Sequence, residues 1–230
     1  PGYLKQAQAI SDELLKSDPD NPGYRLLHAK LHRTRALMFG VDGKKEWQVE
    51  LLKNSITELE TLVTDYPENP EYRFSLVLTQ MIRVRNVPLD NHFGMVTRAE
   101  EICSGLVADH PSVLEYLDLY FSITQKLGRI YFNKKDYRQS IKMYEKSKSA
   151  LLRLIEKSPT VLGYYSQYVN NADGIVECHI RSQNLPAARE ELRGIIGFVE
   201  TSLVFNGTRL KKKEFLDKAV RRLRSLRSEQ

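Results

Sequence analysis

Long apolar runs are missing from this sequence of 230 residues. No stretch approaches the roughly 20 consecutive apolar residues that cross a bilayer as a helix, which excludes a membrane span within these residues. Nothing at the start is typical of a signal peptide, and the first residue is Pro1 rather than Met. We therefore expect a cytoplasmic chain that is a processed or excised piece of a longer protein.

Cysteine is equally scarce. Only Cys103 and Cys178 are present, far apart and without CxxC spacing, which argues against a disulfide framework and against a structural zinc site. We predict that both are small buried apolar side chains.

Motifs for catalysis are absent or incomplete. No phosphate-binding glycine loop and no Gly-x-Ser-x-Gly elbow occurs. His28 and His32 lie four residues apart, a spacing that can bind zinc, but the glutamate of HExxH is missing and the sequence shows no third ligand. Cys178 and His179 are neighbours and would point in different directions on a helix. We predict no enzyme activity, no metal and no cofactor.

The net charge of +6 is concentrated at one end of the chain. Residues 209–230 hold nine Lys or Arg and three acids, so the other 26 basic and 26 acidic residues cancel. The body is therefore electrically balanced, and only the C-terminal segment is strongly basic.

A spaced repeat organises the chain. Successive tyrosines of a Pro-x4-Tyr unit are 48, 44 and 48 residues apart, and the four copies are Pro19/Tyr24, Pro67/Tyr72, Pro111/Tyr116 and Pro159/Tyr164. Each proline ends one helix, and a short turn opens the next. Strand patterns are nearly absent, so we predict about ten helices, of which the first covers Tyr3 to Ser17 and lacks a first-helix partner.

The clearest helix follows Asp136, its expected N-cap. It has apolar residues at three- and four-residue steps and extends about 22 residues, to the turn at Pro159. The apolar stripe of this helix is Tyr137, Ile141, Tyr144, Leu151, Leu152 and Ile155.

One repeat, in residues 116–159, resembles the tetratricopeptide (TPR) consensus. That consensus has Leu-Gly and Tyr on the first helix and small, large and small residues on the second; the matching residues are Leu127-Gly128, Tyr131, Tyr137, Ser140, Tyr144 and Ser147. The first two repeats depart from it with Arg35-Ala36 and Arg83-Val84, and we expect them to pack differently or to bury less. The long period, with text such as Leu106 to Tyr116, is similar to repeat regions of bacterial multidomain signalling proteins, including Ser/Thr kinases.

The resemblance implies a ligand groove, because the first helix of each TPR pair lines the concave face. A lining that is basic at its N-terminal end would favour a carboxylate or phosphorylated segment, and its acidic end would favour a basic one. Ordinary solvated surface residues are the alternative interpretation. The implied groove residues are Lys30, Arg33, Met81, Arg85, Gln125, Arg129, Asn133, Asn170, Asp173 and Glu177.

The basic C-terminal segment forms an amphipathic pattern. Its apolar stripe is Phe215, Leu216, Ala219, Val220, Leu223 and Leu226, with Lys and Arg between Lys211 and Arg227 covering much of the rest. We predict a helix that caps the last repeat. The alternative is binding of nucleic acid or an anionic membrane surface through the same basic residues.

We therefore predict an all-α fold, a right-handed α-α superhelix of about four lengthened TPR-like pairs in residues 1–208, closed by a capping helix in residues 209–230. The predicted function is a non-catalytic scaffold that binds a protein or peptide, as part of a larger signalling protein with more repeats or another domain before Pro1.

Overall fold

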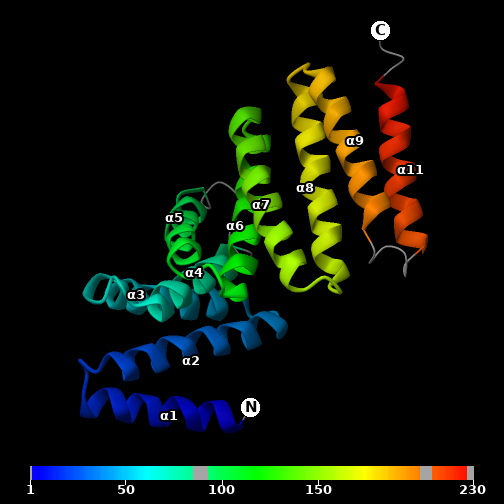
Figure 1. The fold of residues 1–230 in the computed structure, drawn as a ribbon. Coiled ribbons are helices and arrows are strands. Elements are labelled where there is room, and N and C mark those ends of the chain that lie inside the picture. Colours follow the sequence, from blue (N-terminus) through cyan, green and yellow to red (C-terminus); the bar gives the residue numbers. More distant parts are fainter. Residues whose placement is uncertain (1, 85–92, 203–208, 227–230) are drawn as a thin grey trace. The chain divides into compact units, whose positions relative to one another are not determined.

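The computed structural model describes residues 2–84, 93–202 and 209–226, and it divides into two compact units between His110 and Pro111. All regular secondary structure in these ranges is helical, and the ten helices confirm the predicted all-α class. Each helix packs against the next one within its unit, which is the order expected of helix hairpins in a repeat (Figure 1). No helix of the described ranges combines the length and apolarity needed to span a membrane.

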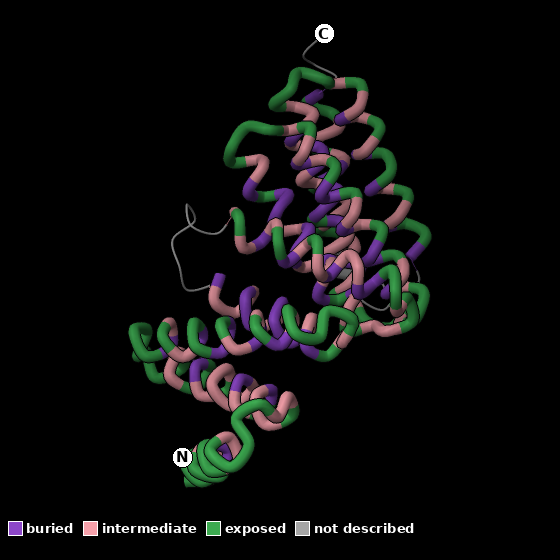
Figure 2. Tube along the Cα trace, turned by 90° about the vertical axis from the view of Figure 1, so that its left-hand side faces the viewer, coloured by how far each residue is buried: buried purple, intermediate pink, exposed green. Residues whose placement is uncertain are grey.

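The described residues of the first unit form five helices. Its helices are α1 Gly2–Ser17, α2 Pro22–Val41, α3 Lys45–Asp65, α4 Pro70–Val84 and α5 Phe93–Asp109. Helix α1 is mostly exposed, with Ser11 as its one buried residue (Figure 2). The side chains of Tyr3 and Ile10 are 88% and 57% exposed.

The second unit also contains five described helices. They are α6 Leu114–Asn133, α7 Tyr137–Lys157, α8 Leu162–Arg181, α9 Leu185–Thr201 and α11 Arg209–Ser225. Helices α8, α9 and α11 lie side by side in Figure 1. The apolar stripe of α11 packs on the core around Leu192 and Val199, with Ala219 and Leu226 buried.

The proline turns form as the sequence predicts. Asn21 and Asn69 each precede a helix that begins with proline, and their side-chain oxygens accept hydrogen bonds from backbone N–H groups of the first turn, at 3.0 to 3.4 Å. Proline suits this first position because its missing N–H would have no partner there. Asp136 caps α7 in the same way, accepting from the Gln139 N–H at 3.1 Å, and α7 covers 21 residues.

The turn between the two helices of a pair has the same backbone conformation in three repeats, although its residues differ. Gly43, Lys135 and Gln183 each lie 19 residues after the repeat tyrosine, and all three have positive φ, at 74°, 62° and 60°. A non-glycine residue rarely adopts this left-handed region. Three repeats with unlike residues at this position therefore use the same backbone turn. The corresponding residue of the second repeat lies outside the described ranges.

The TPR-like contact of the third repeat is a tyrosine ring held between two glycines. A Cβ atom added to Gly128 of α6 or to Gly174 of α8 would lie 2.8 Å from the ring of Tyr144, which belongs to α7. Tyr144 is 7% exposed, and only residues without a side chain leave room for its ring on both sides. The small, large and small pattern of the sequence therefore corresponds to a real close packing of helices.

Two buried serines complete the contact between α6 and α7. Ser140 Oγ donates to the Gly128 carbonyl at 2.8 Å, and Ser147 Oγ donates to the Phe121 carbonyl at 3.0 Å. The first repeat has the equivalent of the second bond, because Ser55 Oγ donates to the Ala29 carbonyl at 2.8 Å across the same 26-residue separation. The two repeats therefore share one register.

The first repeat packs differently from the third, but it is not loosely packed. Ala36 replaces Gly128 and Leu52 replaces Tyr144 at the same repeat positions, and both are fully buried. Arg35 turns away from this contact and donates to Gln8 of α1 at 3.2 Å. Of the two outcomes expected for this repeat, it packs differently, and these two positions are not less buried.

Two of the repeat tyrosines pack within the fold, and a neighbouring tyrosine bonds the proline turn. Tyr72 is buried, and Tyr164 meets Phe121 edge-on at 6.4 Å between ring centroids. The neighbour Tyr165, rather than Tyr164, donates its hydroxyl to the Pro159 carbonyl at 3.0 Å.

Filling the space around Tyr144 should destabilise the fold. We expect Gly128→Ala or Gly174→Ala to lower the free energy of unfolding by about 1–2 kcal/mol, because overpacking exceeds the gain in helix propensity. Gly194→Ala is the matched control, since its Cβ would meet nothing within 4 Å, and it should stabilise by about 0.5–1 kcal/mol. Urea unfolding measures all three, and equal stability of the G128A and G194A variants would contradict the packing.

Both cysteines should be unreactive in the native protein. Cys103 and Cys178 are fully buried, as predicted, and burial raises the pKa of the Cys103 thiol to about 12 and also raises that of Cys178. Because the thiolate is the reactive form, a colorimetric thiol reagent should label neither residue in buffer and both in denaturant. Rapid labelling of the native protein would disprove this burial.

Candidate functional site

The second unit contains a cavity of about 310 Å³ between side chains of α6, α7, α8 and α11. The cavity is lined by Arg129, Phe132 and Asn133 of α6, Tyr144 of α7, Asn170, Asp173, Gly174 and Glu177 of α8, and Arg222 of α11. We call this cavity the unit-2 groove. Five of the groove residues inferred from the sequence lie around it, namely Arg129, Asn133, Asn170, Asp173 and Glu177.

The acidic side of the unit-2 groove is neutralised from within the chain. Arg222 of α11 forms ion pairs with Asp173 and with Glu177, the latter at 2.8 Å, and Lys218 lies 2.8 Å from Asp173. Arg222 and Asp173 are only 24% and 25% exposed, so water screens their pair less than an open surface pair. The acids are therefore already occupied by cations of the same chain.

Arg222 is a groove residue that the sequence did not reveal as one. The sequence shows it only as one of the Lys and Arg residues between Lys211 and Arg227. The available signal was its spacing of four from Lys218, which matches the spacing of Asp173 and Glu177 on α8. Nothing in the sequence shows that these two pairs face each other.

Gln125, also inferred for the groove, lies between two helices. Its amide donates to Gln167 and to Asn171, both at 2.9 Å, so it joins α6 to α8. Asn171 is fully buried and donates to Ser147 Oγ at 2.8 Å. Gln125 therefore belongs to a polar network between helices and does not line the unit-2 groove.

The inferred groove residues of the first unit also contact neighbouring helices. Lys30 of α2 pairs with Glu71 of α4 at 2.5 Å, and Arg33 donates to Thr79 at 3.5 Å. Burial lowers the pKa of Arg33 from its usual value. Met81 is partly buried, and Arg85 lies outside the described residues. Among the described residues of this set, Lys30 and Arg33 therefore contact helix α4.

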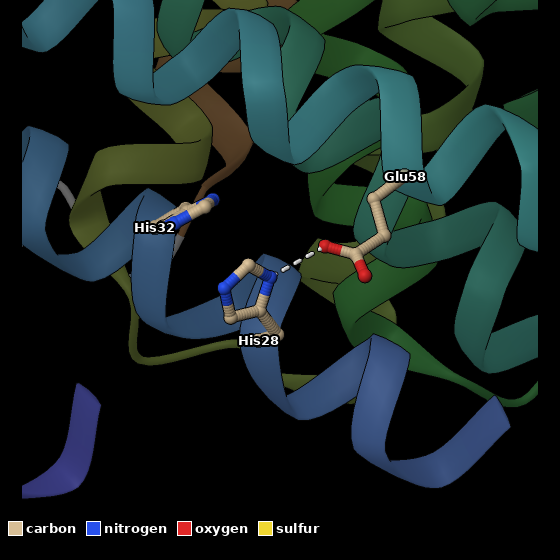
Figure 3. Close-up of side chains that lie close together, drawn as sticks. All are labelled: His28, His32 and Glu58. Atoms are coloured by element: carbon tan, nitrogen blue, oxygen red, sulfur yellow. Dashed lines mark hydrogen bonds and ion pairs between the residues drawn. The ribbon is translucent and has the colours of Figure 1, made fainter. Parts of the chain in front are cut away.

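One group in the described part of the chain has the donor atoms for a metal. His28, His32 and Glu58 each offer a ligand atom within 4.8 Å of the other two (Figure 3). Burial, followed by the charges of His28 and Arg35, lowers the pKa of His32 to about 4. Cys178 and His179 form no such pair, because the Cys178 thiol is buried and donates to Ser140 Oγ at 3.1 Å.

The helix order, the repeated turns and the packing of Tyr144 define a TPR-like α-α repeat protein. No family model matches the sequence, and no curated protein matches it. The fold assignment therefore rests on the geometry of the chain itself.

Three solved structures are similar to this chain at low identity. A thermophilic TPR protein of Thermus thermophilus is 14% identical and has a TM-score of 0.46, with 94% of this chain and 91% of that chain covered. The MamA protein is 17% identical, with a TM-score of 0.45 and 83% of each chain covered. BtubC from P. vanneervenii is 13% identical, with a TM-score of 0.48 and 99% and 89% covered.

Removing Arg222 should loosen the attachment of α11. We expect Arg222→Ala to lower the free energy of unfolding by about 1–2 kcal/mol, because Asp173 and Glu177 would keep partly buried charges without their shared partner. Hydrogen exchange in α11 should also become faster. Arg224→Ala, on the exposed side of the same helix, is the control and should change stability by less than about 0.5 kcal/mol. Equal effects of the two variants would show that the ion pairs contribute nothing.

Proposed function

We propose that this chain is a non-catalytic scaffold that binds a peptide segment of a partner protein in the unit-2 groove. The observation that supports this most is that five of the inferred groove residues line one cavity. They come from α6 and α8, the first helices of two successive pairs. A groove shared by neighbouring helix pairs suits an extended or helical peptide better than a compact small molecule.

The free polar groups of the unit-2 groove indicate the kind of peptide. Arg129, Asn133 and Asn170 are exposed, and amide side chains both donate to and accept from a peptide backbone. No acidic side chain in the described ranges forms an ion pair with Arg129. Because Arg222 already neutralises Asp173 and Glu177, the available charge is that of Arg129. We propose an acidic residue or a terminal carboxylate as its partner, rather than the basic segment first expected for this end.

We also propose that α11 is a capping helix and not the main binding surface. Three apolar residues of α11, Phe215, Leu216 and Leu223, pack against the core of the second unit. Two of its basic residues, Lys218 and Arg222, form ion pairs with acids of α8. These contacts favour the scaffold over nucleic acid or membrane binding through Lys211 to Arg227. The long repeat further supports a place within a larger signalling protein.

A selection of peptides tests the proposed function. A phage-displayed library of random peptides, each roughly 12 residues and so up to about 40 Å when extended, is selected on the immobilised chain. Fluorescence polarisation then measures each enriched peptide against Arg129→Glu. We expect enrichment of acidic peptides and a loss of affinity of at least about tenfold, or about 1.4 kcal/mol.

Arg138→Glu is the matched control, because Arg138 is an exposed arginine on α7 that does not line the unit-2 groove. It should leave the affinity unchanged. Peptides that bind a triple R129E, N133A and N170A variant as tightly as the unaltered chain would reject the groove. A library that yields no enriched peptide would reject peptide binding by this chain.

A further inference from the structure

Three side chains from two helices converge in the first unit. His28 and His32 lie one turn apart on α2, with ring centroids 4.1 Å apart. Glu58 reaches them from α3, and its Oε2 lies 2.9 Å from His28 Nδ1 (Figure 3). The sequence offered only the two histidines, so the third ligand comes from the packing of α2 on α3.

The donor atoms are held in a sheltered place. His28 and Glu58 are each 19% exposed at the side chain. His32 Nδ1 is buried and has no hydrogen-bond partner in the described part of the chain. A buried imidazole nitrogen without a partner is costly, because it has lost water and gained nothing in return. A ligand that accepts this lone pair would remove the cost.

A second carboxylate supports the same histidine from its other edge. Asp12 of α1 lies 3.3 Å from His28 Nε2, while Glu58 lies at Nδ1. Histidines that bind metals usually donate their second N–H to a carboxylate, which fixes the ring and makes the ligating nitrogen more basic. The charges of Glu58 and Asp12 also balance those of a divalent cation.

We propose that His28, His32 and Glu58 form a zinc site that joins α2 to α3, with Asp12 orienting His28. Two imidazoles and one carboxylate are a donor set that zinc prefers over magnesium or calcium. Tetrahedral zinc places its ligands roughly 3.3 Å apart, for bonds of about 2.0–2.1 Å. The three donor atoms lie within 4.8 Å of one another, so they need only move closer together. A water molecule takes the fourth position. The site does not depend on the unit-2 groove.

Competition with a chromophoric chelator measures zinc binding by the full chain, prepared without a histidine tag. We expect one zinc ion per chain and a rise in the thermal unfolding midpoint when zinc is added. Glu58→Gln and His32→Gln should each weaken zinc binding at least tenfold and abolish the rise. His179→Gln, a histidine of α8, is the matched control and should leave both unchanged.

A second measurement covers variants that fail to fold. In the unaltered chain labelled with ¹⁵N, zinc should shift the ring nitrogens of His28 and His32, whereas magnesium at the same concentration should not. Zinc binding as tight in an E58Q and H32Q double variant as in the unaltered chain would overturn the proposal. Zinc that leaves the His28 and His32 ring nitrogens unshifted would overturn it as well.

Discussion

The second unit depends on one close contact, the ring of Tyr144 between Gly128 and Gly174. A side chain on either glycine would push α6 or α8 away from α7, because Tyr144 fills the space between them. The contact sets the distance between successive first helices, and with it the width of the unit-2 groove. Tyr144 itself forms part of the lining, and burial raises its pKa to about 12, so its phenol remains neutral and structural.

Elsewhere in the repeats, the same backbone conformation and the same hydrogen bonds recur although the residues differ. The left-handed turn residue is a glycine, a lysine and a glutamine in three repeats, and the serine to carbonyl bond connects Ser55 to Ala29 and Ser147 to Phe121. Different side chains can meet one geometric requirement when the helices around them fix the backbone. This explains why the first repeat keeps the register of the third without its Leu-Gly and Tyr.

The sequence was sufficient for the parts of the fold that local chemistry decides. Proline positions, the cap Asp136 and the apolar period of α7 specify helices and turns from residues close together in the chain. The contacts of Arg222 with Asp173, of Gln125 with Asn171 and of Glu58 with His28 join residues about 30 to 50 positions apart. They depend on how each helix is rotated about its axis, which a hydrophobic pattern fixes only coarsely. Of the residues inferred for the groove, those of α8 and of the end of α6 line the unit-2 groove, and Gln125 lies between α6 and α8 instead.

The packing around Tyr144 should be the most stable part of the second unit, and native-state hydrogen exchange measures this stability most directly. Backbone amides of α6 and α7 near Gly128 and Tyr144 should exchange only through global unfolding, whereas amides of the exposed helix α1 should exchange through local opening. Exchange near Tyr144 as fast as that in α1 would contradict the account.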